Sequence, residues 1–169
     1  MITLKESENL PEQYFKGVKL HRLIDSFTDN NVIVRGVNSL LQKYVGKYAP
    51  VASDVIFDYY LVNNWSCYNV IPFNDFCIKV YEIIERHMDI APEKVQNITK
   101  VMIDDDFLKK YSNIVGLDFV FNKMNKRARY DVDFKQSIKA IQLDDEFLNN
   151  AFNTFYPAII KEVKVFCSC

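Results

Sequence analysis

The sequence predicts an all-α fold, a single-domain bundle of about seven helices, from three observations. At 169 residues the chain is in the usual range for one domain and is long enough to bury a sizeable core. Hydrophobic residues make up 49% of it and include thirteen Phe and ten Tyr, so a large apolar area must be buried on folding. Four Gly and five Pro supply little turn chemistry, which favours long helices over many short strands.

The first predicted helices begin where apolar residues start to recur at helical spacing. Residues 1–13 are polar and lack periodicity, so we expect a polar leader there and a helical domain over residues 14–169. From Tyr14 to about residue 30, apolar residues recur on one helical face: Phe15, Val18, Leu23, Ile24 and Phe27. The same spacing predicts a second helix from Val32 to Tyr48.

The third predicted helix, about Val51 to Asn64, is apolar almost all round, which is typical of a helix in the middle of a bundle. Pro50 suits its first turn, and Ser53 or Asp54 could cap its N-terminus. This helix nevertheless carries a second aspartate, Asp58, four residues after Asp54. An ionised carboxylate among apolar neighbours is costly unless a cation compensates it.

The remaining elements continue the helical pattern. Residues 73–89 read as an amphipathic helix, and Pro92 opens another. After the acidic triple at 104–106 we expect a short helix and then a longer one that ends near Lys126, Arg127 and Arg129, where cations complement the helix dipole. A final helix covers about residues 143–166, and Pro157 favours a kink in it.

Charge and cysteine content exclude several classes of protein. Twenty-one basic and twenty-two acidic residues give a net charge of −1, which argues against a nucleic-acid-binding protein. The start is too polar for a secretory signal, and no run of about 18 uncharged apolar residues could span a membrane. Four cysteines without CxxC spacing argue against a disulfide framework. A soluble cytoplasmic protein is expected.

The stretch GVKLHRLIDSFTDNN spaces His21, Asp25 and Asp29 four residues apart, on one side of a helix. Joined by Asp58, and by Asp54 as a further candidate, these side chains could hold a divalent metal ion. A His with carboxylates favours manganese, magnesium or iron over a thiolate-bound metal. The alternative is an ordinary i,i+4 pair of solvated charges, with Asp54 as an N-cap and Asp29 at a helix end.

The densest basic group is Lys123, Lys126, Arg127 and Arg129. Such a group is either a solvated face or a surface that receives a phosphate or an acidic partner.

Four segments occur in the order and approximate spacing seen in the acyl carrier protein phosphodiesterases: GVKLHRLIDSFTDNN, APVASDVIFDYYLVNNW, GLDFVFNKMNKRAR and FYP. The chain therefore resembles this family from about Phe15 to Val165. The resemblance implies a fold distantly similar to HD-type metal phosphohydrolases. It also implies manganese-dependent hydrolysis, by metal-activated water, of the phosphodiester that links 4′-phosphopantetheine to the serine of holo acyl carrier protein, giving apo carrier and free 4′-phosphopantetheine.

The resemblance also assigns roles to residues. His21 and Asp25 match the His-Arg-x-Ile-Asp motif of the family, and Asp58 matches the second Asp of its Asp-x-x-x-Asp helix. These three are implied as catalytic residues and metal ligands, with Asp29, which matches a Thr-Asp pair, as a further ligand. Mn²⁺ is the implied cofactor, and Mg²⁺ or Fe²⁺ are alternatives. The substrate-binding residues are expected to be Arg22, Lys126, Arg127 and Arg129.

One part of the family pattern is absent from this sequence. Family members usually begin with a Phe-Leu-Ala-His-Leu segment and a Gly-Asn-x-x-x-Asp motif, and residues 1–17 contain neither. The chain is then either one that begins inside a longer protein or a short relative. Two further readings stay open: an HD-like phosphohydrolase that acts on a small phosphate ester, and a non-catalytic relative that binds the carrier without cleaving it.

Overall fold

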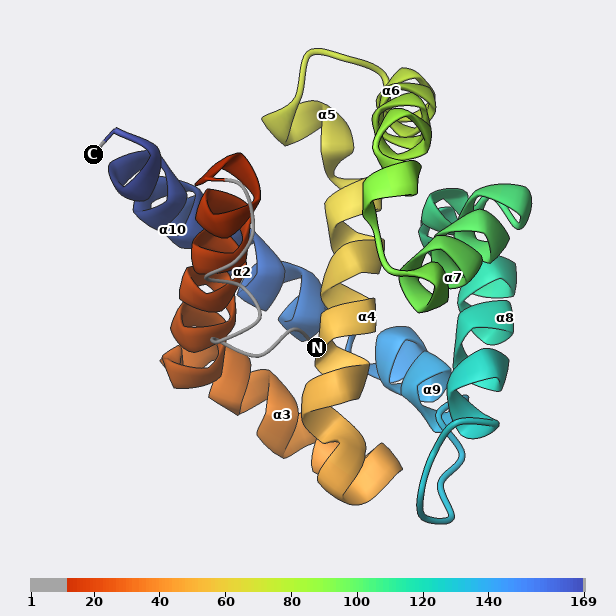
Figure 1. Ribbon diagram of the computed structural model, residues 1–169. Helices are drawn as coiled ribbons and strands as arrows, with labels where there is room; N and C mark the ends of the chain where they lie inside the picture. The colour runs from red at the N-terminus through yellow and green to blue at the C-terminus, as the bar shows by residue number, and fades with distance from the viewer. Residues whose placement is uncertain (1–11, 169) are drawn as a thin grey trace. The chain divides into compact units, whose positions relative to one another are not determined.

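The computed structural model describes residues 12–168, and all regular structure within that range is helical (Figure 1). No strand occurs among these residues, so the all-α prediction is confirmed. The predicted leader lies outside the described residues except at Glu12 and Gln13, which already belong to the first described helix.

The helices follow one another with short connections. In order they are α2 (Glu12–Asn30), α3 (Val32–Val45), η1 (Gly46–Tyr48), α4 (Ala49–Asn63), α5 (Trp65–Tyr68), α6 (Phe73–Arg86), η2 (Met88–Ile90), α7 (Glu93–Asp104), η3 (Phe107–Ser112), α8 (Ile114–Asn125), α9 (Gln136–Leu143) and α10 (Asp145–Cys167), where η marks a 3₁₀ helix. The sequence did not predict α5 and α9 as separate helices. Both are too short for a periodic apolar pattern to stand out.

Residue contacts group the described chain into two units. The first comprises residues 12–40 and 146–168, and the second comprises residues 41–145. One boundary therefore falls inside α3 and the other at the start of α10. The single-domain organisation and the HD-like arrangement stay predictions.

The first unit contains α2, the first part of α3, and α10. Its aromatic packing includes Phe27 of α2 against Phe155 of α10, with ring centroids 6.0 Å apart. The buried residues of α10 recur every three or four positions, as one helical face requires: Leu148, Ala151, Phe152, Phe155 and Ile159. The helix continues through Pro157.

In the second unit, α4 has seven buried residues and also an exposed side. Ala52, Ile56 and Tyr60 face the core, whereas Asp54 and Asp58 are exposed to solvent. The predicted N-caps were wrong. Because α4 starts directly after η1, Tyr48 is its N-cap and Ser53 and Asp54 lie beyond the first turn. Pro50 does occupy the first turn, where its missing N–H costs nothing.

A close approach fixes the corner between η3 and α8. A Cβ atom added at Gly116 would lie 2.0 Å from the backbone oxygen of Lys110, so only glycine fits there. The Asn113 side chain caps α8 by accepting a hydrogen bond from the Gly116 N–H at 2.9 Å. At the other end of η3, the Leu108 N–H donates to the Tyr81 hydroxyl at 2.9 Å. These contacts hold η3 in place from both ends.

Two of the exclusions made from sequence can be compared with the described residues. None of the described helices combines the length and apolar character needed to cross a membrane. The described cysteines Cys67, Cys77 and Cys167 are free thiols.

Candidate functional site

Two of the predicted ligands meet on α2, in the first unit. The Nδ1 atom of His21 lies 3.2 Å from an Asp25 carboxylate oxygen, one helical turn away. Both side chains are open to solvent, with 67% and 49% of their area exposed. Asp29 follows one turn later and is exposed, while Arg22 is partly exposed. The helical spacing therefore presents an imidazole and a carboxylate together, as the sequence predicted.

Asp58 lies in the second unit, on the face of α4 that also carries Asp54. The residue is exposed to solvent, but protein also packs around its carboxyl group. Enough protein surrounds the carboxyl group that desolvation raises its pKa to about 7. The negative charge of Asp54 raises this pKa further, and a hydrogen bond from Tyr111 opposes the rise.

Tyr111 is a site residue that sequence reasoning missed. It lies on η3, and its hydroxyl donates a hydrogen bond to Asp58 of α4, far earlier in the chain. Burial and the nearby carboxylates raise the pKa of Tyr111, so the hydroxyl keeps its proton and acts as a donor. One tyrosine in the segment FLKKYS carries no signal of this role. Only the packing of η3 against α4 reveals it.

The carboxyl groups of Asp54 and Asp58 are of a kind that binds a divalent cation. A carboxyl group whose pKa is near 7 can take up or release a proton at neutral pH. A cation beside Asp54 and Asp58 would relieve their mutual repulsion and favour the ionised forms. The imidazole and carboxylate of His21 and Asp25 are donors of the type that manganese, magnesium or iron accept. In residues 12–168, no group of three or more His, Cys, Asp and Glu side chains is clustered so that it could hold a metal by itself.

The predicted basic group divides into two parts. Lys123 forms an ion pair with Asp105, so its charge is neutralised within the second unit. Lys126, Arg127 and Arg129 are exposed. Lys126 is the C-cap of α8, and the guanidinium of Arg129 lies 5.6 Å from the ring centroid of Tyr130. The three expected substrate-binding cations of this segment therefore face solvent.

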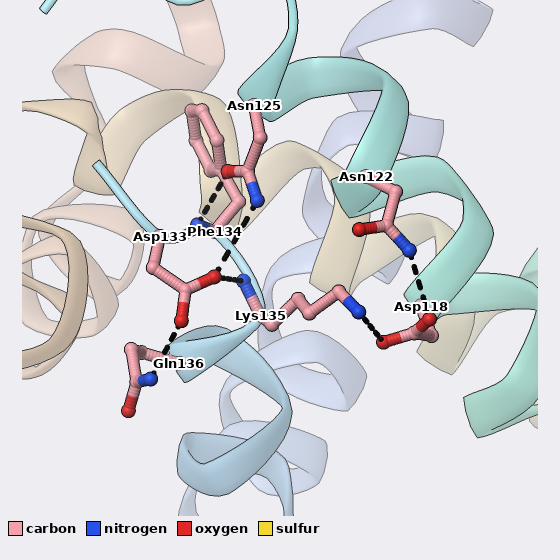
Figure 2. Close-up of polar contacts among 7 residues, drawn as sticks. All are labelled: Asp118, Asn122, Asn125, Asp133, Phe134, Lys135 and Gln136. Carbon is pink, nitrogen blue, oxygen red and sulfur yellow. Dashed lines mark hydrogen bonds and ion pairs between the residues drawn. The ribbon is translucent and has the colours of Figure 1, made fainter. Parts of the chain in front are cut away.

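The base of the loop that carries these cations is tied down (Figure 2). The Asn125 side chain accepts a hydrogen bond from the Phe134 N–H at 2.8 Å, which joins the two ends of the loop. Several hydrogen bonds lower the pKa of Asp133, and the one from the Gln136 side chain has the largest effect. The Asp133 carboxylate therefore stays ionised and holds these donors in place. Lys135 pairs with Asp118 of α8 at 3.0 Å. The loop is thus fixed at both ends next to α8.

The described residues form an all-α protein whose helices present acidic, imidazole and cationic side chains to solvent. A family model described as acyl carrier protein phosphodiesterase matches residues 1–159, so the chain belongs to this family.

Individual relatives carry the same description. The acyl carrier protein phosphodiesterase of Escherichia coli O6:H1 (strain CFT073) is 25% identical over 157 residues, which cover 92% of this chain and 81% of the relative. The protein of the same name from Yersinia pestis is 22% identical over 157 residues, which cover 91% and 80%. No solved structure matches the chain.

Proposed function

We propose that this protein hydrolyses the phosphodiester that joins 4′-phosphopantetheine to the serine of holo acyl carrier protein. The products are the apo carrier and free 4′-phosphopantetheine. The observation that carries this proposal is the family match over residues 1–159, which is supported by relatives that bear the same name. A cytoplasmic location and an HD-like helical arrangement belong to the same proposal.

The proposed cofactor is Mn²⁺, with Mg²⁺ or Fe²⁺ as alternatives. Its proposed ligands are His21, Asp25 and Asp58, with Asp29 as a further ligand. The donor types support this choice, since imidazole and carboxylate groups suit these ions. The paired His21 and Asp25, and the raised pKa of Asp58 beside Asp54, support it as well. When bound, the metal would activate water and offset charge on the phosphoryl oxygens.

Side chains of the protein would orient the metal ligand and contact the substrate. The pKa of Asp58 is about 7 without a metal, and a bound cation would keep its carboxylate ionised as a ligand. Tyr111 donates a hydrogen bond to Asp58 and so restricts the orientation of the carboxylate. Arg22, Lys126, Arg127 and Arg129 are the proposed contacts to the phosphate and to the acidic surface of the carrier.

The decisive experiment is intact-mass spectrometry of holo acyl carrier protein after incubation with this protein and Mn²⁺. Loss of the whole 4′-phosphopantetheine mass is expected with the parent and not with Asp58→Ala. Hydrolysis in H₂¹⁸O should place the label in released 4′-phosphopantetheine, because water attacks phosphorus and the serine oxygen leaves. A carrier that retains a phosphate on its serine would contradict the proposed bond cleavage.

Two other outcomes would select the alternative functions. Turnover of a nucleotide or another small phosphate ester without carrier cleavage would favour an HD-like phosphohydrolase. Tight carrier binding with no bound metal and no product would identify a non-catalytic binding protein.

A further inference from the structure

An apolar groove lies in the second unit, where α7 and α8 meet η3. Its volume is about 190 Å³, and its apolar lining is Ile98, Val101, Met102, Phe107, Val120 and Met124. The charged residues that line it are Asp105, Lys123 and Arg127. Pockets for small molecules usually measure roughly 300 to 1,000 Å³. The groove is smaller, and its size suits one or two apolar side chains of a partner.

The apolar surface continues from the groove along α7. Val95, Ile98 and Val101 are 43%, 55% and 50% exposed and are spaced three residues apart, so they form a row on the helix surface. A row of aliphatic side chains beside a groove is the arrangement that receives the apolar face of another helix. A short apolar arm of a small molecule would fill the groove without covering this row.

The charges beside the row are cationic. Lys94 precedes Ile98 by four residues and therefore lies on the same face of α7. Arg127 lines the groove, and neither cation forms an ion pair with a described residue. The acidic Asp105 is already paired with Lys123. Helical spacing turns Glu93 away from this face, whereas Asp104, three residues after Val101, lies at its edge. The groove therefore complements a partner helix that carries acidic residues around an apolar anchor.

The groove and the candidate site share one element. The ring of Phe107, which lines the groove, packs edge-on against the ring of Tyr111, with centroids 5.7 Å apart. The Tyr111 hydroxyl in turn hydrogen-bonds to Asp58. A protein held in the groove would thus be positioned next to the acidic face of α4, within the same unit.

We propose that the groove between α7 and α8 is the docking surface for the protein part of acyl carrier protein. An apolar side chain on an acidic helix of the carrier enters the groove, and Lys94 and Arg127 contact the acidic residues around it. This inference rests on the proposed function, since it takes the carrier as the substrate. It assigns to the groove the recognition of the folded carrier and not of the prosthetic group.

The test measures the Kd for apo and holo acyl carrier protein by isothermal titration calorimetry, with matched variants. The double variant Ile98→Ser/Val101→Ser is compared with Leu143→Ser/Val115→Ser, which alters two aliphatic residues that are 75% and 82% exposed outside the groove. Lys94→Glu is compared with Lys100→Glu, which makes the same charge change on the opposite side of the same helix.

We expect the groove double variant to weaken binding of both carriers about tenfold or more, and Lys94→Glu to weaken it about threefold or more. The two control variants should stay within about twofold of the parent. In turnover assays of holo carrier, KM should rise by the same factors while kcat stays unchanged, because the groove binds a part of the substrate that does not react.

Other outcomes would overturn the inference. Equal Kd values for groove and control variants would show that the carrier docks elsewhere. Competition by free 4′-phosphopantetheine, with no binding of apo carrier, would show that the groove holds the prosthetic group. A parent dimer that Ile98→Ser/Val101→Ser makes monomeric, with carrier binding unchanged, would assign the groove to a second copy of the chain.

Binding and cleavage are measured separately, so the two proposals can fail separately. Groove-dependent binding without cleavage would refute the hydrolysis and leave the docking surface standing. Cleavage that is insensitive to the groove variants would refute the docking surface alone, and a parent that does not bind the carrier would refute both.

Discussion

At the scale of single residues, the properties of Asp58 come from three neighbours of different kinds. The surrounding protein disfavours its charge, Asp54 repels it, and Tyr111 stabilises it through a hydrogen bond. The first two effects prevail, so the pKa rises from 3.8 to about 7. The folded state therefore holds the proton of Asp58 more tightly than the unfolded chain does.

This pKa predicts how stability depends on pH in metal-free buffer. The contribution of Asp58 is fully present below about pH 4 and is lost as the pH rises through about 7, because the unfolded chain releases the proton first. Asp58→Asn cannot ionise and should avoid the loss. Above pH 7 we expect it to raise the free energy of unfolding relative to the parent by on the order of 1 kcal/mol, after allowing for screening at a solvent-accessible group.

Urea denaturation of both proteins at several pH values from 4 to 8 checks this prediction. The difference between Asp58→Asn and the parent should grow across that range. A difference that stays constant would show that Asp58 titrates as it does in the unfolded chain.

Tyr111→Phe removes the hydroxyl that favours the ionised form of Asp58. We expect a loss of roughly 1–3 kcal/mol in the free energy of unfolding at pH 8, where Asp58 is charged, and a smaller loss at pH 4. Tyr44→Phe is the matched control, since the Tyr44 hydroxyl bonds to the Asp144 carboxylate at 3.1 Å elsewhere in the same unit. Equal losses at both pH values for Tyr111→Phe would exclude a bond to the ionised carboxylate.

At the scale of elements, the corner between η3 and α8 places Tyr111. The corner depends on Gly116, which admits the Lys110 carbonyl at a distance that no side chain allows. The Asn113 cap and the bond from Leu108 to Tyr81 fix the two ends of η3. A short 3₁₀ helix with weak internal hydrogen bonds is held by its neighbours and not by its own propensity.

Gly116→Ala should therefore be strongly destabilising. Its Cβ would lie 2.0 Å from a backbone oxygen, and neither helix can move without breaking the corner. We expect a loss of about 2–4 kcal/mol in the free energy of unfolding. Gly36→Ala is the control. Gly36 is in the interior of α3, and nothing lies within 4 Å of a Cβ atom added there. That change should stabilise the protein by roughly 0.5–1 kcal/mol.

Thermal or urea unfolding of the two glycine variants distinguishes these effects. A mild cost for Gly116→Ala would mean that η3 can shift away from α8. Gly116→Ala should also weaken binding of the carrier, since η3 contributes Phe107 to the groove.

The elements also show where helical periodicity reaches its limit as a predictor. The long helix α2, with His21 and Asp25 one turn apart, follows from the spacing of its residues. The start of α4 does not, because η1 ends directly before it and Tyr48 takes the N-cap position. The apolar residues of α4 predicted a helix in the middle of a bundle. Only the packing of other elements around α4 shows that Asp54 and Asp58 lie on an exposed face.

At the scale of the whole molecule, a net charge of −1 conceals an uneven distribution. Within the second unit, Lys123 and Lys135 are paired with aspartates, while Lys126, Arg127 and Arg129 are exposed. The global charge argued against a general polyanion binder. The local excess of cations allows attraction to an acidic partner protein.

The proposed metal site predicts how Mn²⁺ changes the stability of the protein. Saturating Mn²⁺, at about 100 times its Kd, should raise the free energy of unfolding by roughly 2.7 kcal/mol and the melting temperature by roughly 5–10 °C. His21→Ala and Asp58→Asn should each abolish most of this rise. His87→Ala, which alters the histidine that is the C-cap of α6, should retain it. Differential scanning calorimetry with and without Mn²⁺ makes the measurement.

If His21→Ala keeps the full rise, His21 is not a ligand. If the parent shows no rise, the proposed cofactor is wrong, whichever residues were chosen.

The sequence by itself determined the all-α class, most of the helices, the pairing of His21 with Asp25, and the family. These follow from composition, from local spacing along one helix, and from the order of motifs. Only the tertiary structure decided that Asp58 is reached by solvent, that Tyr111 bonds to it, and that α7 and α8 form a groove. Each of those features joins residues far apart in the chain, and helical periodicity carries no information about which helical faces meet.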